Sequence, residues 1–203
     1  MPFGSYQNAI DASSNFFKKE TFKITPQIEK LPYAMQLVEH QSKNTLMVLA
    51  HYENEHLTWV DSQNNGFTTL HGKIISSNGL VNDFENLHPP NLLIIFEKLN
   101  KNPFTKINKE SLVRFLNPQT TYLNALHSFS LIKPEPGKLF KRRIDGKLIK
   151  FLMLQEEVTV QGIFWRYTNV YWLDVNGNVL KSKQYISPDS PKYFLETIKS
   201  FKI

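Results

Sequence analysis

The sequence predicts an all-β protein, and three observations lead to this fold class. The 203 residues include 15 Phe, 8 Tyr and 3 Trp, and aromatic side chains suit the half-buried surface of a pleated sheet. Apolar and polar residues alternate through residues 169–188, as they do in a strand with one buried face. Asp-Gly and Asn-Gly pairs, which favour tight hairpins, interrupt two of these runs.

The first half of the chain predicts a meander of strands. Residues 33–40 and 44–53 are expected to pair, and residues 56–62 to follow as a third strand. Residues 67–79 are expected to form a tight hairpin that turns at His71-Gly72. The run Leu46–Ala50 is apolar on both faces, which predicts a central strand.

The second half predicts longer hairpins with two-residue loops. Strands are expected within residues 122–132, 138–154 and 157–186, with turns at Asp145-Gly146 and Asn176-Gly177. A two-residue loop at Asn176-Gly177 would place Trp172 opposite Lys181, and Leu173 opposite Leu180.

Two helical segments are expected in addition to the strands. Within residues 1–20, the apolar positions of residues 5–19 have helical spacing. Within residues 88–118, Leu92, Ile95, Phe96 and Leu99 repeat at i, i+3, i+4 and i+7 before Pro103, and another turn or two is expected at 112–116. The whole chain, 1–203, is long enough for a single domain with one sizeable core.

Charge and composition limit the function classes. The formal net charge of +6 favours an acidic partner, such as phosphates, anionic lipid headgroups or acidic sugars. There is no cysteine, which excludes disulfides and thiolate nucleophiles within this sequence. The longest apolar run, Leu92–Phe96, is far shorter than the roughly 20 residues that cross a bilayer.

No catalytic or metal-binding motif is recognisable. Glu156 and Glu157 are adjacent, so a strand would direct them to opposite faces and prevent them from acting on one bond. The segment 51–56, HYENEH, lacks any known ligand spacing, and on a strand His51, Glu53 and Glu55 would share one face. We therefore expect no catalytic residue, no metal and no cofactor.

Two groups of residues could bind a ligand. Trp165 and Trp172, with Tyr167 and Tyr171, could stack on sugars, although such residues also serve as core or rim packing. A turn at Asp145-Gly146 would place Lys141 opposite Lys150, with Arg143 on the same face. This basic face fits contact with an acidic polymer or lipid headgroups, but a charged edge that prevents strand pairing between molecules explains it slightly better, because the charges then need no partner.

Several segments of the chain resemble a known family. The chain from about Phe22 to the C-terminus is similar to the group 4 capsule lipoproteins of the YjbF type, the GfcB-like and YmcC-like family of Gram-negative bacteria. The likeness is weakest between Leu87 and Gln119. Its most specific pieces are Leu31-Pro32-Tyr33-Ala34, the Leu57-x-Trp59 strand, and the hairpin from Tyr171-Trp172-x-Asp174 to Gly177.

The resemblance implies an antiparallel β-barrel or strongly curved meander sheet. It also implies an outer-membrane lipoprotein that faces the periplasm, acts without enzymatic activity in capsule or exopolysaccharide secretion, and binds a glycan or a partner of the export complex. It implies no nucleic-acid partner. A lipid or lipoprotein carrier with an apolar concave sheet is the alternative.

This sequence differs from the family pattern at two points. His71-Gly72 stands where Asn-Gly is usual, and the acylated cysteine is missing. We expect the full gene to encode a signal peptide that ends in a cysteine shortly before Pro2 or Phe3, whose lipids would anchor the domain in the membrane.

Overall fold

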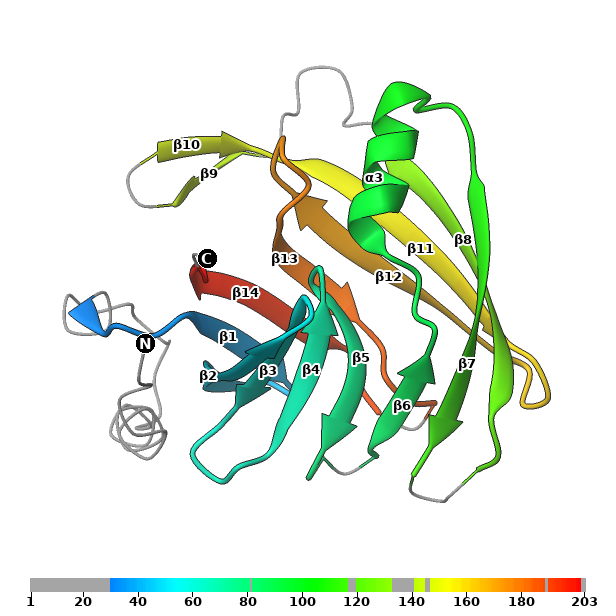
Figure 1. Ribbon diagram of the computed structural model, residues 1–203, viewed down its shortest axis with the longest axis horizontal. Helices are drawn as coiled ribbons and strands as arrows, with labels where there is room; N and C mark the ends of the chain where they lie inside the picture. The colour runs from blue at the N-terminus through cyan, green and yellow to red at the C-terminus, as the bar shows by residue number, and fades with distance from the viewer. Residues whose placement is uncertain are drawn as a thin grey trace.

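Most of the residues that the structure describes lie in antiparallel strands, so the predicted all-β class is confirmed. The computed structural model describes residues 30–80, 82–116, 120–132, 141–144, 147–188 and 190–201. Twelve strands form one closed barrel in the order β1-β14-β13-β12-β11-β8-β7-β6-β5-β4-β3-β2 (Figure 1). Strands β9 and β10 form a separate hairpin that extends from the body of the barrel.

The barrel strands pair with their neighbours in the chain, with one interruption and one closure. The β9–β10 hairpin interrupts the order, so β8 pairs with β11. The barrel closes where β1 pairs with β14, for example Val38 with Leu195. The bounds of the strands are β1 Met35–His40, β2 Lys43–Glu53, β3 His56–Val60, β4 Gly66–Leu70, β5 Lys73–Asn78, β6 Phe84–Leu87, β7 Ile107–Phe115, β8 Leu123–Ile132, β9 Lys141–Ile144, β10 Lys147–Lys150, β11 Leu152–Val160, β12 Trp165–Leu173, β13 Val179–Gln184 and β14 Tyr193–Lys199.

Strand β2 is buried on both faces, which confirms its predicted central place. It pairs with β1 on one side and β3 on the other. Met47 faces the barrel interior, whereas Leu46 and Val48 pack on the other face in a cluster that includes Leu31 and Tyr33. The segment before β1 therefore covers the outside of β2, which explains why the run is apolar at consecutive positions.

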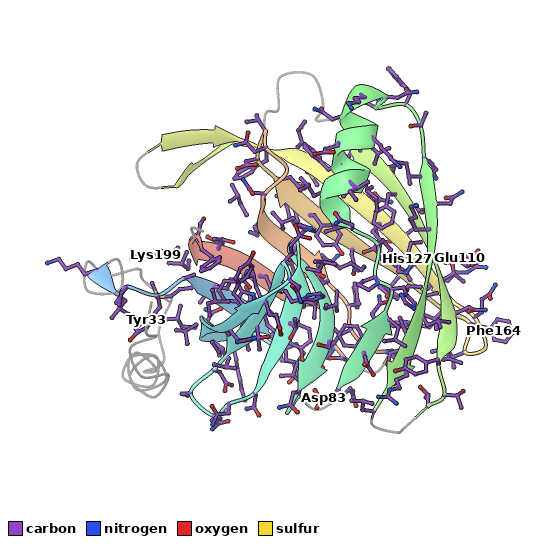
Figure 2. The ribbon with its side chains drawn as sticks, in the orientation of Figure 1. Tyr33, Asp83, Glu110, His127, Phe164 and Lys199 are labelled. Carbon is purple, nitrogen blue, oxygen red and sulfur yellow. The ribbon has the colours of Figure 1, made fainter. Side chains whose placement is uncertain are left out.

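The predicted tight turn at His71-Gly72 is confirmed. Leu70 pairs with Lys73 across it, and His71 and Gly72 have φ values of 48° and 83°, as a type I′ turn requires. Asp145-Gly146 lies outside the described residues, although Ile144 and Lys147 pair on either side of it. The β11–β12 hairpin ends in an exposed Phe164 with φ 52°, visible at the tip in Figure 2.

The predicted register of the β12–β13 hairpin is half correct. Trp172 pairs with Lys181, as expected, but Leu173 pairs with Val179 and not with Leu180, because the register shifts between Trp172 and Leu173. The Asp174 amide donates to the Asn178 carbonyl and closes a loop of five residues, 174–178. Asn176-Gly177 therefore lies at the tip of this longer loop and does not form a two-residue turn.

The central part of the predicted helical insertion is confirmed, and its C-terminal part is wrong. Helix α3, Leu92–Lys101, begins after the N-cap Asn91, whose side chain accepts a hydrogen bond from the Ile94 amide. Residues 112–116, where another turn or two of helix was expected, belong largely to β7, which pairs with β6 and β8. Sheet pairing there overrides a short apolar spacing that fits either structure.

The expected N-terminal helix, residues 1–20, lies outside the described residues. The single domain spanning 1–203 therefore stays a prediction. Among the residues that the structure describes, no helix is long and apolar enough to cross a membrane.

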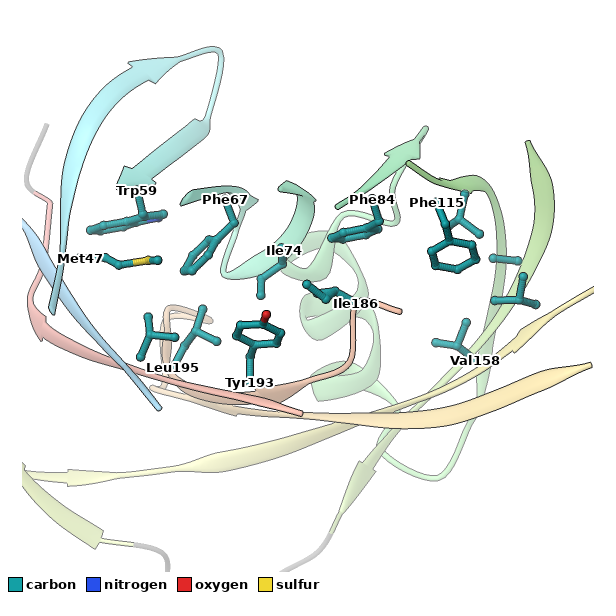
Figure 3. Close-up of a cluster of buried hydrophobic side chains, with 14 of the residues drawn as sticks. Met47, Trp59, Phe67, Ile74, Phe84, Phe115, Val158, Ile186, Tyr193 and Leu195 are labelled. Carbon is teal, nitrogen blue, oxygen red and sulfur yellow. The ribbon is translucent and has the colours of Figure 1, made fainter. Parts of the chain in front are cut away.

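The barrel interior is filled by two apolar clusters. The larger cluster contains Met47, Trp59, Phe67, Phe115 and Leu195, whose side chains meet across the interior (Figure 3). The second cluster joins the buried face of α3 to inward residues of β8, β11 and β12, namely Leu92, Ile95, Phe96, Leu99, Phe129, Leu154, Tyr171 and Leu173. Helix α3 thus packs against the inner face of the sheet and fills that part of the barrel (Figure 1).

Candidate functional site

A layer of polar side chains lies between the two apolar clusters. On β11, Glu156 stands between Leu154 of one cluster and Val158 of the other. On β8, His127 stands in the same way between Ala125 and Phe129. Along these strands, the inward-facing side chains are therefore apolar, then polar, then apolar again.

Glu156 is the centre of this layer and has no exposed surface. One carboxylate oxygen, Oε1, lies 2.5 Å from Nζ of Lys73 and 2.7 Å from Nδ1 of His127. The other, Oε2, accepts from Nδ2 of Asn169 at 2.9 Å and from the hydroxyl of Tyr171 at 2.6 Å. Four donors from three strands other than β11 satisfy the buried charge, as burial of a carboxylate requires.

Gln184 extends the layer across the barrel from β13 to β5. Its side-chain oxygen accepts from the Ile74 amide at 2.9 Å, and its nitrogen donates to the Gly72 carbonyl at 2.8 Å. Lys73, on the same strand β5, reaches Glu156 of β11. Since β5 is not adjacent to β11 or β13 in the barrel, these contacts hold opposite walls together.

The environment fixes the protonation states of the cluster. Burial alone would raise the pKa of Glu156, but the Lys73 ammonium and the hydrogen bond from His127 outweigh it and hold the pKa well below its usual range. Burial lowers the pKa of His127, despite the carboxylate beside it. Burial also raises the pKa of Tyr171 well above its usual value. The layer therefore holds one ion pair, Lys73 with Glu156, beside a neutral His127 and a neutral Tyr171.

Ser111, His127 and Glu156 form a chain of hydrogen bonds in the order found in serine hydrolases. The Ser111 hydroxyl lies 2.8 Å from Nε2 of His127, whose Nδ1 donates to the carboxylate. However, Ser111 is only 6% exposed and His127 only 2%. A groove on β7, β8 and β11 includes His127 in its lining but not Ser111, and Ser111 does not line the cavity described next. Because both side chains are buried, we interpret this chain of hydrogen bonds as part of the core.

A cavity of about 260 Å³ lies beside α3 at the tips of two hairpins. We call it the mouth cavity. Its walls come from the β4–β5 tip, the β12–β13 tip, β1, β3, α3, and β14 with the residues after it. They include Gln36, Trp59, His71, Asp174, Thr197 and Phe201. Its walls combine two aromatic rings with amide and hydroxyl groups, the composition of a site for a small polar ligand.

The segment HYENEH does not gather metal ligands. His51 and Glu53 lie on β2, with Nε2 and Oε2 3.6 Å apart. Glu55, expected on the same face, instead belongs to the Asn54-Glu55 turn, where φ is 49° and 69°, and its carboxylate lies 3.5 Å from His71. No group of three or more potential ligands occurs among the described residues.

Comparison with known proteins decides the family. The model of the family described as "Group 4 capsule polysaccharide lipoprotein gfcB, YjbF" matches residues 10–198. The chain belongs to this family. No protein with a curated description matches the sequence significantly. The crystal structure of the hypothetical lipoprotein YmcC from Escherichia coli (K12) has the same fold, with a TM-score of 0.63 and 20% identity over 87% of this chain and 89% of that one.

In this member of the YjbF family, the predicted ligand residues do not form one site. Lys141 pairs with Lys150 in the β9–β10 hairpin, as predicted, and Arg143 pairs with Leu148. Trp165 packs against the larger core cluster and stacks on Tyr167 at 4.1 Å between ring centroids. Trp172 lies seven residues along the same strand, on the outer face, where Nζ of Lys181 lies 5.8 Å from its ring centroid. Their roles in binding stay predictions.

Sequence reasoning missed the polar layer and the mouth cavity of this YjbF-family barrel. One signal for the layer was present: Glu156 shares its strand face with Leu154, Val158 and Val160, and all three are fully or almost fully buried. A charged residue within an apolar face predicts a buried partner. The cavity has no such signal, because it forms where hairpin tips that are distant in sequence meet.

Proposed function

We propose that this YjbF-family domain is a non-catalytic accessory of capsule or exopolysaccharide secretion that contacts the acidic polymer through its basic hairpin. We place it at the outer membrane, facing the periplasm and held by an N-terminal lipid anchor, with proteins of polysaccharide export or assembly as its partners. The family match over residues 10–198 is the observation that carries this proposal.

The register of the basic hairpin supports the contact with an acidic polymer. Lys141 and Lys150 are directly paired, and like charges placed opposite each other destabilise a ladder by about 0.2–1 kcal/mol. A bound polyanion would relieve this repulsion. The hairpin extends from the body of the barrel, where a long polymer has access to it (Figure 1).

The alternative function, a lipid carrier, is less well supported. An acyl chain needs a long apolar cavity, whereas Trp59, Phe67, Phe129 and the buried face of α3 fill the interior among the described residues. The mouth cavity, at about 260 Å³ with polar groups in its wall, does not offer such a space.

The test measures binding of the organism's own acidic exopolysaccharide to the parent and to the triple variant Lys141→Glu, Arg143→Glu, Lys150→Glu. The matched control reverses three exposed lysines elsewhere, Lys43→Glu, Lys109→Glu and Lys192→Glu. Each reversal changes the charge by two, so three reversals take both variants from +6 to 0. The comparison therefore separates a local contact from the overall charge.

We expect the hairpin variant to lose most binding and the control to retain most of it. Binding by the parent should weaken sharply as salt rises, because charges on the surface are screened over about 8–10 Å at physiological ionic strength. Equal binding by the parent and a folded hairpin variant would show that this hairpin is only a charged edge that prevents strand pairing.

A further inference from the structure

We propose that the mouth cavity binds a single neutral sugar residue of the secreted polymer, at a chain end or a branch. This proposal rests on the proposed function and names the ligand of a second contact, separate from the basic hairpin. Four features of the cavity carry it: a buried amide oxygen without a partner, aromatic walls, a lining without lysine or arginine among the described residues, and its size.

The first feature is Gln36, which lines the cavity from β1. It is 8% exposed, and its side-chain oxygen has no hydrogen-bond partner among the described residues. A buried polar group without a partner destabilises the protein, so a ligand that supplies a partner is favoured. A sugar hydroxyl both donates and accepts, and it therefore satisfies the Gln36 amide in either of its two orientations.

The second feature is the apolar part of the wall. Trp59 borders the cavity from the larger core cluster, and because its ring nitrogen donates to Thr69 at 2.9 Å, the small part of the ring that reaches the cavity is apolar. Phe201 forms another part of the wall and packs against Tyr52, with ring centroids 4.9 Å apart. Apolar walls with a few polar groups suit a pyranose ring, which has C–H faces and a rim of hydroxyls.

The third feature is charge, which selects a neutral sugar. Among the described residues, the lining contains no lysine or arginine, and its titratable groups are Asp174 and His71, whose Nε2 lies 3.5 Å from the Glu55 carboxylate. Both oxygens of Asp174 hold its own loop by accepting from Asn176 and Asn178. A uronic acid would bring a further carboxylate close to those of Asp174 and Glu55 without a lysine or arginine in the lining to pair with it, and such repulsion is a source of specificity.

The fourth feature is size. At about 30 Å³ for each water molecule, a cavity of about 260 Å³ holds roughly nine waters. This space is near the lower end of ligand pockets, which begin at about 300 Å³. This volume matches one sugar ring better than two, so a terminal or branch residue is the favoured ligand.

The test uses nuclear magnetic resonance on the isotope-labelled protein with galactose, glucose, N-acetylglucosamine and glucuronic acid as probes. We expect at least one neutral sugar to shift the side-chain signals of Gln36 and Trp59, with millimolar affinity. Glucuronic acid should bind at least tenfold more weakly. The variant Gln36→Leu should weaken the neutral sugar by about tenfold, the equivalent of one buried hydrogen bond.

Two further variants make the outcome decisive. Gln63→Leu is the control, because Gln63 is exposed in the β3–β4 loop, and it should bind as the parent does. Thr197→Val replaces Gln36→Leu if that variant does not fold, because Thr197 pairs with Gln36 and also lines the cavity. Binding of none of the three neutral sugars, or equal binding of glucuronic acid, overturns the proposal. If the acidic polymer still binds the basic hairpin, the proposed function stands without this cavity.

Discussion

Glu156 is the residue on which the polar interior of the barrel depends. Its carboxylate accepts from Lys73, His127, Asn169 and Tyr171, so all four donors would lose a partner if it were removed. A buried ion pair of this kind contributes little net stability compared with an apolar core, but breaking it costs about 3–5 kcal/mol. The main effect of the cluster is therefore to fix how the walls of the barrel pack, and its net contribution to stability is small.

The first prediction is that the barrel loses stability as the pH falls below 6.5. The unfolded chain takes up a proton on His127 near its ordinary pKa of 6.5, whereas the folded protein resists protonation because burial lowers that pKa. Each such proton lowers the free energy of unfolding by up to about 1.4 kcal/mol per pH unit. A further loss should begin below pH 4.5, where the unfolded chain protonates Glu156 and the folded chain does not.

Urea unfolding between pH 7 and pH 3 measures this dependence. The variant His127→Gln should show a smaller loss between pH 7 and pH 5 and the same loss below pH 4.5. Some dependence should remain above pH 5, because burial also lowers the pKa of His40. A parent protein whose stability is constant from pH 7 to pH 5 would contradict the assignment of a neutral, buried His127.

The second prediction is that Ser111 has a structural role and no reactivity. Ser111→Ala leaves Nε2 of His127 without its partner and should destabilise the protein by about 1–3 kcal/mol. Ser128→Ala, on the outer face of β8, should change the stability by no more than about 0.5 kcal/mol. A fluorophosphonate probe should not label the parent. Labelling of Ser111, detected by mass spectrometry, would instead show access to a nucleophile.

At the residue scale, strand alternation predicted part of this arrangement. It placed Glu156 and Glu157 on opposite faces, and the structure confirms this, with Glu156 buried and Glu157 exposed. It could not show which face is inside or which residues meet there. Lys73 is 83 residues from Glu156 in the sequence and His127 is 29 residues from it. Only closure of the barrel brings them together.

At the element scale, one loop type occurs twice and explains the wrong register of the β12–β13 hairpin. In the loops 61–65 and 174–178, the opening aspartate accepts from the amides two and four residues later. The fourth residue, Asn64 or Gly177, has positive φ. Asn-Gly alone predicts a two-residue turn, but an aspartate two residues earlier stabilises a longer loop by capping its amides.

The third prediction compares two glycines at hairpin tips. Gly72 and Gly162 have φ values of 83° and 88°, so alanine at either position carries left-handed strain of about 1–2 kcal/mol. A Cβ atom at Gly72 would lie 2.4 Å from Cβ of Val179, whereas the nearest atom to one at Gly162 is Cδ2 of Leu123, at 3.3 Å. Gly72→Ala should therefore cost about 1–3 kcal/mol more than Gly162→Ala.

Chemical unfolding of the two alanine variants measures this difference. Because the β4–β5 tip contacts β13 through Gly72 and Val179, the excess cost reports contact across the barrel. If both variants lose the same stability, the two walls are not packed as closely as the structure shows.

At the scale of the whole molecule, local patterns predicted the strands but not how the barrel closes. Alternation and turn residues act between neighbours, so the consecutive hairpins were predictable. The pairing of β1 with β14 joins the two ends of the sheet, and no local signal specifies it. The same limit explains residues 112–116, whose apolar spacing fits a helix until pairing with β6 and β8 fixes a strand.

The whole molecule also separates the two proposed contacts. The basic hairpin lies outside the barrel order, between β8 and β11, and the mouth cavity is formed by barrel strands and α3. Charge on the hairpin suits the acidic repeat of a polymer, and the cavity suits a neutral unit. Neither contact needs a chemical step, which agrees with the burial of the Ser111–His127–Glu156 chain.

Size-exclusion chromatography with light scattering tests the polymer-binding role when the organism's acidic exopolysaccharide is incubated with the protein at low salt. We predict that the protein co-elutes with the polymer and that the polymer keeps its molar mass. Co-elution should be lost in the Lys141→Glu, Arg143→Glu, Lys150→Glu variant and retained in the control that reverses Lys43, Lys109 and Lys192. A shortened polymer, or a parent protein that elutes separately from it, would contradict a non-catalytic, polymer-binding role.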